Sequence, residues 1–420
     1  MAKKLKRIFK KIGPGIITGA SDDDPSGIAT YSIAGASQGY GLLWTALLTF
    51  PLMAAIQEMC ARIGVVTERG LAGNIKSVYK SKPLLYFLAL LIVVANTINI
   101  GADLAGMAQA TNLLVPAHPL LVAAITTGLI IILMIKFPYK FIADKLKWLT
   151  FALFAYVASA LVTKQDWDQI LISTFVPSFD FNRESITLIV AILGTTISPY
   201  LFFWQTSEEV EERKEIEREK HKKIIVTKHE LKQVSEDVNL GMFFSNLVMF
   251  AIIATTASTL YRFGINEITT ASDAAKALEP IAGSASSLLF TLGIVGTGLL
   301  AIPVLAGSAA YAVSEIFGWR EGLSKSFRQA RAFYGVIIVS TVIGFLMNLA
   351  NINPFKALFA TAVIYGLISP ILIMFILLIA NKKQVMGNAA NNTASNILGG
   401  FTLILMTAAA TVFLFLKFKG

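Results

Sequence analysis

Long apolar stretches recur along the whole 420-residue chain, and they constrain its fold more than any other feature. A helix needs about 20 consecutive apolar residues to cross the hydrocarbon core of a bilayer. Because 55% of the residues are apolar and only 15% are charged, against about a quarter in soluble domains, we expect one all-helical integral membrane protein. We place eleven transmembrane helices near residues 14–38, 42–66, 84–112, 119–135, 146–163, 186–206, 238–260, 285–317, 330–348, 355–380 and 396–417.

The basic residues between these stretches predict the orientation of the chain. Connectors rich in Lys and Arg alternate with connectors that hold few of them, and the positive-inside rule assigns the rich ones to the cytoplasm. With eleven spans, the N-terminus is then cytoplasmic and the C-terminus extracellular. We therefore expect a multi-pass protein of the plasma membrane, in a prokaryote the inner membrane. The basic segments are the N-terminus and residues 69–82, 136–147, 320–331 and 382–383.

The net charge of +10 would suggest nucleic acid as a partner for a soluble protein. In a membrane protein it indicates attraction to the anionic lipids of the cytoplasmic leaflet, so we expect the lipid bilayer and no nucleic acid as a partner. The connector 208–237 is dense in both signs, with Glu and Lys three or four residues apart, which favours a solvated cytoplasmic helix. A regulatory role for this connector stays open.

Several other features indicate structure rather than chemistry. The chain contains neither a Gly-x-x-x-x-Gly-Lys-Ser/Thr phosphate loop nor a His-Glu-x-x-His motif, so we expect no enzyme activity and no resident cofactor. Glu58 and Arg62 stand four apart on the second span, which favours an ion pair. Cys60 is the only cysteine, and we interpret it as a structural thiol.

Two spans are interrupted in the middle by residues that a lipid-facing helix does not tolerate. Asp22, Asp23 and Asp24 precede Pro25 in the first span, and Pro199 lies at the midpoint of the sixth. Irregular backbone at membrane depth is tolerated only where protein or a water-filled cavity satisfies it. Spans 1 and 6 occupy matching positions if spans 1–5 and 6–10 are two halves. Such paired interruptions point to the midplane site of an inverted-repeat transporter.

Polar residues inside the spans are few, so each one is a candidate for the site. Asp24 is the strongest candidate, whereas Asp22 and Asp23 either line the approach or face a wet vestibule without a ligand. Asn99 and Asp103 belong to a polar stripe on the third span that either lines a path or joins two helices. The remaining candidates are Thr195, Ser198 and Tyr200 at the second break and Tyr365 on the tenth span.

The donor atoms at the two breaks define the class of ligand. Carboxylate, hydroxyl and freed carbonyl groups are hard oxygen donors, and neither break contains a thiolate, an imidazole or a thioether. Such oxygen sites suit Mg²⁺, Ca²⁺ and Mn²⁺. Three neighbouring aspartates disfavour an anionic substrate, so we expect a divalent metal cation.

At these residues the chain resembles the NRAMP family of divalent-metal transporters, and the resemblance covers nearly its whole length. It implies the LeuT-type 5+5 inverted-repeat fold, with spans 1 and 6 unwound at the midplane. The 420 residues would then form a single transporter domain, with repeats at about 12–163 and 186–380 and an extra helix at 396–417. The matching segments are GPGIITGASDDDPSGIATYSIAGA, GLLWTALLTFPLMAAIQEMCARIGVVT, Ala102-Asp103-Leu104-Ala105 and LGTTISPY ending at Tyr200.

The sequence departs from the family pattern at the residues that carry the family's chemistry. In the family's first-span motif, Asp-Pro-Gly-Asn, the Asp and Asn bind metal; here Asp24 is retained and Gly27 stands in place of Asn. The family's Met-Pro-His in span 6 is replaced by a motif with Ser198 and Tyr200 in place of Met and His. Gly106 replaces a glutamate on span 3. The resulting Asp-Pro-Ser-Gly motif is similar to that of the NRAMP-related magnesium transporter branch.

The resemblance and the donor chemistry together favour Mg²⁺, with Mn²⁺ as a second substrate, carried into the cytoplasm as a partly hydrated ion without proton coupling. Asp24 would supply the charge, Gly27 and Thr195 carbonyls, Ser198 a hydroxyl, and Tyr200 would shape the cavity. We expect a monomer. One alternative is a proton-coupled Mn²⁺/Fe²⁺ transporter of the ordinary NRAMP type, which the missing Met and His disfavour. The other is a metal sensor that does not transport.

Overall fold

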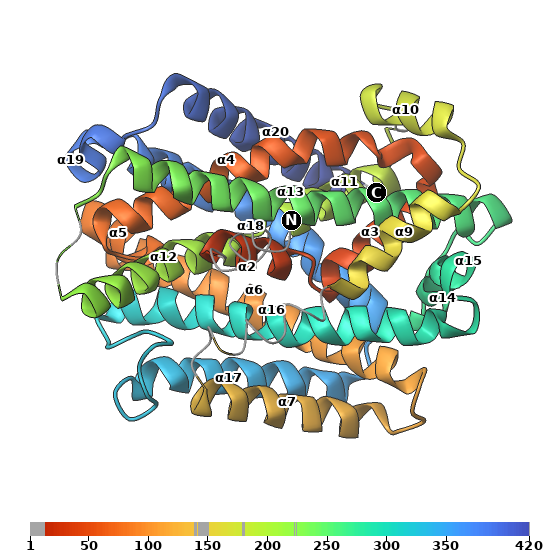
Figure 1. Cartoon of the computed structure of the whole chain (residues 1–420), viewed down its shortest axis with the longest axis horizontal. Helices are drawn as coiled ribbons and strands as arrows, with labels where there is room; N and C mark the ends of the chain where they lie inside the picture. The colour runs from red at the N-terminus through yellow and green to blue at the C-terminus, as the bar shows by residue number, and fades with distance from the viewer. Residues whose placement is uncertain are drawn as a thin grey trace.

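The computed structural model describes residues 13–137, 141, 151–178, 181–221, 223 and 225–419. In these residues the regular structure is entirely helical, as the sequence predicts, and Figure 1 shows long helices lying side by side. The long helices are α4 (Trp44–Thr67), α6 (Lys82–Asn112), α7 (Pro119–Lys136), α13 (Lys228–Thr259), α16 (Ser286–Phe317), α17 (Arg331–Met347), α18 (Pro354–Ala380) and α20 (Thr393–Lys419). The shorter helices are α5 (Leu71–Val78), α9 (Phe154–Val162), α10 (Trp167–Phe175), α14 (Ala271–Ala275), α15 (Glu279–Ala282) and α19 (Lys383–Met386), and α9 lies in the predicted fifth span.

Both interruptions predicted from the sequence are confirmed. The first span consists of α2 (Pro14–Asp22) and α3 (Pro25–Gln38), and the sixth consists of α11 (Arg183–Thr196) and α12 (Pro199–Lys220). Two residues separate the helices of each pair. A proline opens α3 and α12, where its missing N–H costs nothing because the first amides of a helix have no partner within it.

Nine helices or joined helix pairs among the described residues are long and apolar enough to cross a membrane. They correspond to nine of the eleven predicted spans. The first span is absent from this set because every stretch of 18 residues across α2 and α3 contains Asp22, Asp23 and Asp24. The fifth, predicted near 146–163, lies partly outside the described residues. The count of eleven therefore stays a prediction.

The helices of the two halves pack against their counterparts. α4 contacts α13, α6 contacts α16 and α7 contacts α17, while α2 contacts α12 and α3 contacts α11. This reciprocal pairing is what an inverted repeat produces. Figure 1 shows α7 and α17 together along one edge and α20 along the opposite edge. The repeat boundaries at 12–163 and 186–380 stay a prediction.

The charged connector 208–237 is helical, as its composition favours, but it is divided between two helices. It is the end of α12 and the beginning of α13, because Thr227 and Glu230 form a capping box that starts a new helix. The Arg213 guanidinium is buried and lies 2.9 Å from a carboxylate oxygen of Glu230 and 3.6 Å from one of Glu68. The connector is therefore packed against the end of α4.

Two structural interpretations from the sequence are confirmed. Nη2 of Arg62 lies 3.0 Å from Oε2 of Glu58, and Nη1 donates a hydrogen bond to the carbonyl of Ala389. Cys60 is fully buried. The Arg62 hydrogen bonds hold α4 against the segment before α20.

Helix α2 is fixed to α13 along its length. The Asp237 carboxylate of α13 accepts hydrogen bonds from the backbone N–H groups of Gly13 and Gly15, at 3.1 and 2.7 Å, and so caps the start of α2. Farther along, Gly19 and Gly241 bring the two backbones into direct contact. Small residues at such a crossing permit the close approach that stabilises helix pairs in membranes.

We expect Gly19→Ala to lower the free energy of unfolding by at least about 2 kcal/mol, because the new Cβ would overlap the Gly241 carbonyl. Thermal unfolding of the purified protein in detergent measures this change. Gly128→Ala on α7 is the matched control, since no atom lies within 4 Å of the position of its Cβ. Equal melting temperatures for the two variants would contradict the close contact.

Candidate functional site

The two breaks lie against each other in the centre of the helix bundle. The Tyr200 hydroxyl, in the first turn of α12, donates a hydrogen bond of 2.9 Å to the carbonyl of Ser21 in the last turn of α2. On the other side of the first break, a Cβ at Gly27 would lie 3.2 Å from the Thr195 hydroxyl oxygen. The interrupted segments of spans 1 and 6 therefore form one site.

Asp24 is buried at the start of α3 and acts as its N-cap. Its Oδ1 accepts hydrogen bonds from the Gly27 N–H at 2.8 Å and from the Ser26 hydroxyl at 2.6 Å. Its Oδ2 accepts a hydrogen bond of 2.9 Å from the Asn99 amide on α6. Oδ1 thus stabilises the start of α3, and Oδ2 faces α6, the third span.

Hydroxyl groups satisfy the carbonyls freed at the second break. Ser198 donates to the carbonyl of Thr195 at 2.6 Å. Ser369 on α18 donates to the carbonyl of Ile197 at 2.8 Å. Because these carbonyls have lost their helical partners at membrane depth, such bonds are required for the break to exist.

The polar stripe on α6 has two different environments. Asn96 accepts a hydrogen bond of 3.0 Å from the Tyr365 hydroxyl and donates to α16, so this end of the stripe joins helices. Asn99 faces the site, where its Oδ1 accepts a hydrogen bond of 2.8 Å from Thr361 in addition to the bond it donates to Asp24. Asp103 is fully buried, and neither of its carboxylate oxygens has a hydrogen-bond partner among the described residues.

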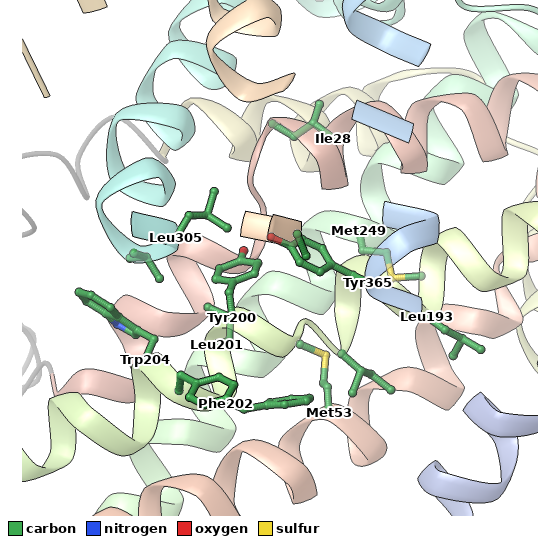
Figure 2. Close-up of a cluster of buried hydrophobic side chains, with 14 of the residues drawn as sticks. Ile28, Met53, Leu193, Tyr200, Leu201, Phe202, Trp204, Met249, Leu305 and Tyr365 are labelled. Carbon is green, nitrogen blue, oxygen red and sulfur yellow. The ribbon is translucent and has the colours of Figure 1, made fainter. Parts of the chain in front are cut away.

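Tyr200 and Tyr365 form one wall of the site. Their ring centroids are 5.6 Å apart, and Figure 2 shows both hydroxyl groups turned toward the same region. Hydrophobic side chains surround the two rings, among them Ile28 and Leu305. In such an apolar setting electrostatic interactions are stronger than in water.

Asp22 and Asp23 end α2 and lie on its contact with α13. The Ser245 hydroxyl is 2.7 Å from Oδ2 of Asp22 and 3.4 Å from Oδ1 of Asp23, so the two carboxyl groups converge on one donor. Both residues are buried. Asp22 and Asp23 are adjacent to Asp24 in sequence, but they contact α13, whereas Asp24 contacts α6.

Sequence reasoning did not identify Ser245 or Thr361 as part of the site. Each is a hydroxyl residue in an otherwise apolar helix, and most such residues bond to the carbonyl of the preceding turn. No local pattern distinguishes the two from the other hydroxyl residues. Their role becomes visible only when α13 and α18 are packed against the first break.

The described residues contain no cluster of three or more His, Cys, Asp or Glu side chains close enough to hold a metal ion. The carbonyl of Thr195 is bonded to Ser198. Gly27 lies in the first turn of α3, where the helical pattern assigns its carbonyl to the amide four residues later. The site can therefore offer a cation single carboxylates, amides and hydroxyls, and water would complete the coordination.

A cavity of about 830 Å³ lies at the end of the bundle where α4, α12 and α16 meet the loop after α16. Acidic and basic side chains line it together, including Glu211, Lys214, Glu315 and Glu321. Burial, reinforced by the neighbouring Glu315 carboxylate, raises the pKa of Glu321 to about 8. Its carboxyl group therefore exchanges a proton near neutral pH.

A protein-family model described as natural resistance-associated macrophage protein-like matches residues 15–416. The divalent metal cation transporter MntH of Caldanaerobacter subterraneus subsp. tengcongensis is 26% identical, over 99% of this chain and 95% of that protein. The MntH of Clostridium acetobutylicum is also 26% identical, over 100% of this chain and 94% of that protein.

Two solved structures share the fold. A crystal structure of the Eremococcus coleocola manganese transporter has a TM-score of 0.75 at 17% identity, over 97% of this chain and 86% of that chain. Mhp1, a nucleobase-cation-symport-1 family transporter in a closed conformation, has a TM-score of 0.51 at 12% identity, over 97% of this chain and 93% of that chain. The LeuT-type fold expected from the sequence is thereby confirmed.

Proposed function

This chain belongs to the natural resistance-associated macrophage protein-like (NRAMP) family, and from that premise we propose that it transports divalent metal cations across a membrane. The MntH proteins of two bacteria, named as divalent metal cation transporters, support this proposal because they align over nearly the whole chain. Helices of membrane-spanning length, with a polar site between two broken spans, supply the architecture that transport requires.

Within this class we propose Mg²⁺ as the main substrate and Mn²⁺ as a second one. The observation that carries the proposal is the set of side-chain oxygens at the two breaks, which are the Asp24 carboxylate and the hydroxyls of Ser26, Ser198 and Tyr200. Ser198 and Tyr200 stand in the places of the family's Met and His. Mg²⁺ dehydrates reluctantly and is usually held by one or two carboxylates with several waters, which suits a site of this composition.

The proposed metal site consists of Asp24, Gly27, Thr195, Ser198 and Tyr200. Asp24 supplies the charge, the hydroxyls contact the ion or its water shell, and the two carbonyls become ligands when the break rearranges. The path to this site involves Asp22, Asp23, Asn99, Asp103 and Tyr365. The cavity beside Glu315 and Glu321 is the cytoplasmic mouth of the path, because it adjoins the basic connectors assigned to that side.

We further propose a single-domain monomer in the plasma membrane, with the N-terminus in the cytoplasm and the C-terminus outside. Uptake is driven by the ion gradient and the membrane potential, which contributes about 4.6 kcal/mol for a divalent ion at 100 mV. Proton coupling is absent because Tyr200 and Gly106 replace a histidine and a glutamate of the family pattern. An ordinary proton-coupled Mn²⁺/Fe²⁺ transporter is the alternative, and the last experiment below decides between the two.

Asp24→Ala should abolish Mg²⁺ and Mn²⁺ uptake while leaving the protein folded. A unit-charge pair at close range is worth about 4 kcal/mol even at an effective dielectric constant of ~20, so loss of the carboxylate weakens binding by about three orders of magnitude. Ion-sensitive dyes inside proteoliposomes measure the flux. Asp168→Ala, at an exposed position in α10, is the matched control and should transport normally. Normal flux through Asp24→Ala would remove this residue from the site.

Gly27→Asn combined with Ser198→Met should shift the preference from Mg²⁺ toward Mn²⁺ and Cd²⁺. A thioether adds little for Mg²⁺ and more for softer ions, and the larger side chains leave less room for water. The Asn side chain must displace the Thr195 hydroxyl by a few tenths of an ångström, so Ser198→Met alone serves as the variant without this crowding. An unchanged ratio of Mg²⁺ to Mn²⁺ flux in both variants would show that selectivity is set elsewhere.

Mg²⁺ uptake into proteoliposomes should cause no acidification of the lumen at a clamped membrane potential. A pH-sensitive dye in the lumen measures this. Glu321→Gln is the control, because a carboxyl with a pKa of about 8 would release its proton when a cation arrives. Acidification that requires Mg²⁺, persists in Glu321→Gln and disappears in Asp24→Ala would show that transport is proton-coupled.

A further inference from the structure

The core around the first break contains four carboxyl groups, from Asp22, Asp23, Asp24 and Asp103, all of them 3% exposed or less. No Lys, Arg or His among the described residues forms an ion pair with any of them. A buried charge without a partner is strongly unfavourable. Protons or cations must therefore balance the negative charge of these groups. One divalent ion at Asp24 balances only two of the four negative charges.

The geometry divides the four groups into two pairs. Asp24 faces α6, where the Asn99 amide donates a hydrogen bond to it and Asp103 lies one turn farther along the same helix. Asp22 and Asp23 instead face α13, where they share the Ser245 hydroxyl. Each pair has a formal charge of −2 when ionised, which is the charge that one divalent cation balances.

The Asp22 carboxyl group shows that a proton alone does not satisfy the second pair. Its Oδ1 is buried without any hydrogen-bond partner among the described residues. A protonated oxygen would need an acceptor, and an ionised oxygen would need a donor or a cation. A metal ion or its water shell meets this requirement, because it supplies both charge and donors.

Tyr31 on α3 is an independent indication of a ligand at the same place. This residue is fully buried, and its hydroxyl has no hydrogen-bond partner among the described residues. The Tyr31 ring and the Asp22 carbonyl oxygen both lie 3.4 Å from the place that a Cβ on Gly27 would take, so Tyr31 is next to the end of α2. A neutral oxygen that is left unpaired beside carboxyl groups is a suitable ligand for a hard cation or its water.

The position of the pair also favours a cation. Asp22 is the last residue of α2 and Asp23 is its C-cap. The C-terminal end of a helix has a partial negative charge, and the ends of interrupted helices bind cations in this class of transporter fold. The helix end and the two carboxylates are therefore all negative, and all of them attract a cation.

We propose that Asp22, Asp23, Ser245 and Tyr31 bind a second divalent cation, Mg²⁺ or Mn²⁺, in series with the ion at Asp24. The inference rests on the proposed function, since it assigns a second substrate ion to the same path. Two carboxylates, two hydroxyls and several waters form the ligand set. The two ions occupy opposite sides of the first break, one against α13 and the other against α6.

Counting bound Mn²⁺ tests this inference. MnCl₂ is titrated into the purified full-length protein, and the free ion is measured from its electron paramagnetic resonance signal. Wild type should bind two Mn²⁺ per chain, both displaced by Mg²⁺. Asp22→Asn combined with Asp23→Asn should bind one, and so should Asp24→Asn. Asp168→Asn is the matched control on an exposed carboxylate and should still bind two.

Two results would overturn the inference: a single Mn²⁺ bound by wild type, or two bound by the Asp22→Asn/Asp23→Asn variant. Both are distinct from failure of the proposed function, which would appear as normal Mg²⁺ flux through Asp24→Asn or as no flux through wild type. A wild type that transports but binds one ion therefore refutes only the second site.

If the Asp22→Asn/Asp23→Asn variant does not fold, Ser245→Ala and Tyr31→Phe test the second site instead, because they keep all four carboxyl groups. Each variant should lower the affinity for the second Mn²⁺ about tenfold, which is the effect of losing one hydrogen bond or ligand to a charged group. The affinity of the first ion should not change. Unchanged affinity for both ions in both variants would overturn the proposal.

Discussion

The structure depends on one constraint, which is that every peptide group released from a helix inside the membrane must find a partner within the protein. The Asp24 carboxylate caps α3 at the first break. Tyr200 bonds the last turn of α2, and Ser369 bonds the carbonyl of Ile197 at the second break. The Tyr200 and Ser369 bonds cross from one element to another. Interrupting two spans therefore requires that α2, α12 and α18 be packed together, and the packing creates a polar site in an apolar bundle.

The features that sequence predicts correctly are those with a local physical cause. Apolar length marks the long helices. Each break is marked by a proline together with polar or small residues before it, since a proline alone is tolerated inside α4, α16 and α18. Asp24 was identified because ionisable residues inside spans are rare and because it directly precedes the proline of the first break. The connector 208–237 is helical, but its division into two helices did not follow from the sequence. Its composition favours helix, but the capping box at Thr227 and the burial of Arg213 against α4 depend on the fold.

The part of the site that sequence does not predict consists of contacts between distant helices. Ser245 lies more than 200 residues from the carboxylates that it contacts, and Thr361 is 262 residues from Asn99. A single hydroxyl in an apolar helix gives no sign of which neighbour it will meet. The stripe on α6 illustrates the limit well: its spacing identified a buried face, but only the packing separates Asn96, which joins helices, from Asn99, which contacts Asp24.

The capping of α2 by Asp237 and the glycine contact with α13 have a mechanical consequence. Tilting α2 away from α13 would break the Asp237 hydrogen bonds and the glycine contact, so these bonds favour movement of the two helices together. Any movement of α3 relative to these two helices is concentrated in the two residues between α2 and α3. Such bending changes the separation of the Asp22 and Asp24 carboxylates directly. Ion occupancy and bending are then thermodynamically linked, because a bound cation stabilises the hinge angle that holds its ligands at the right distance.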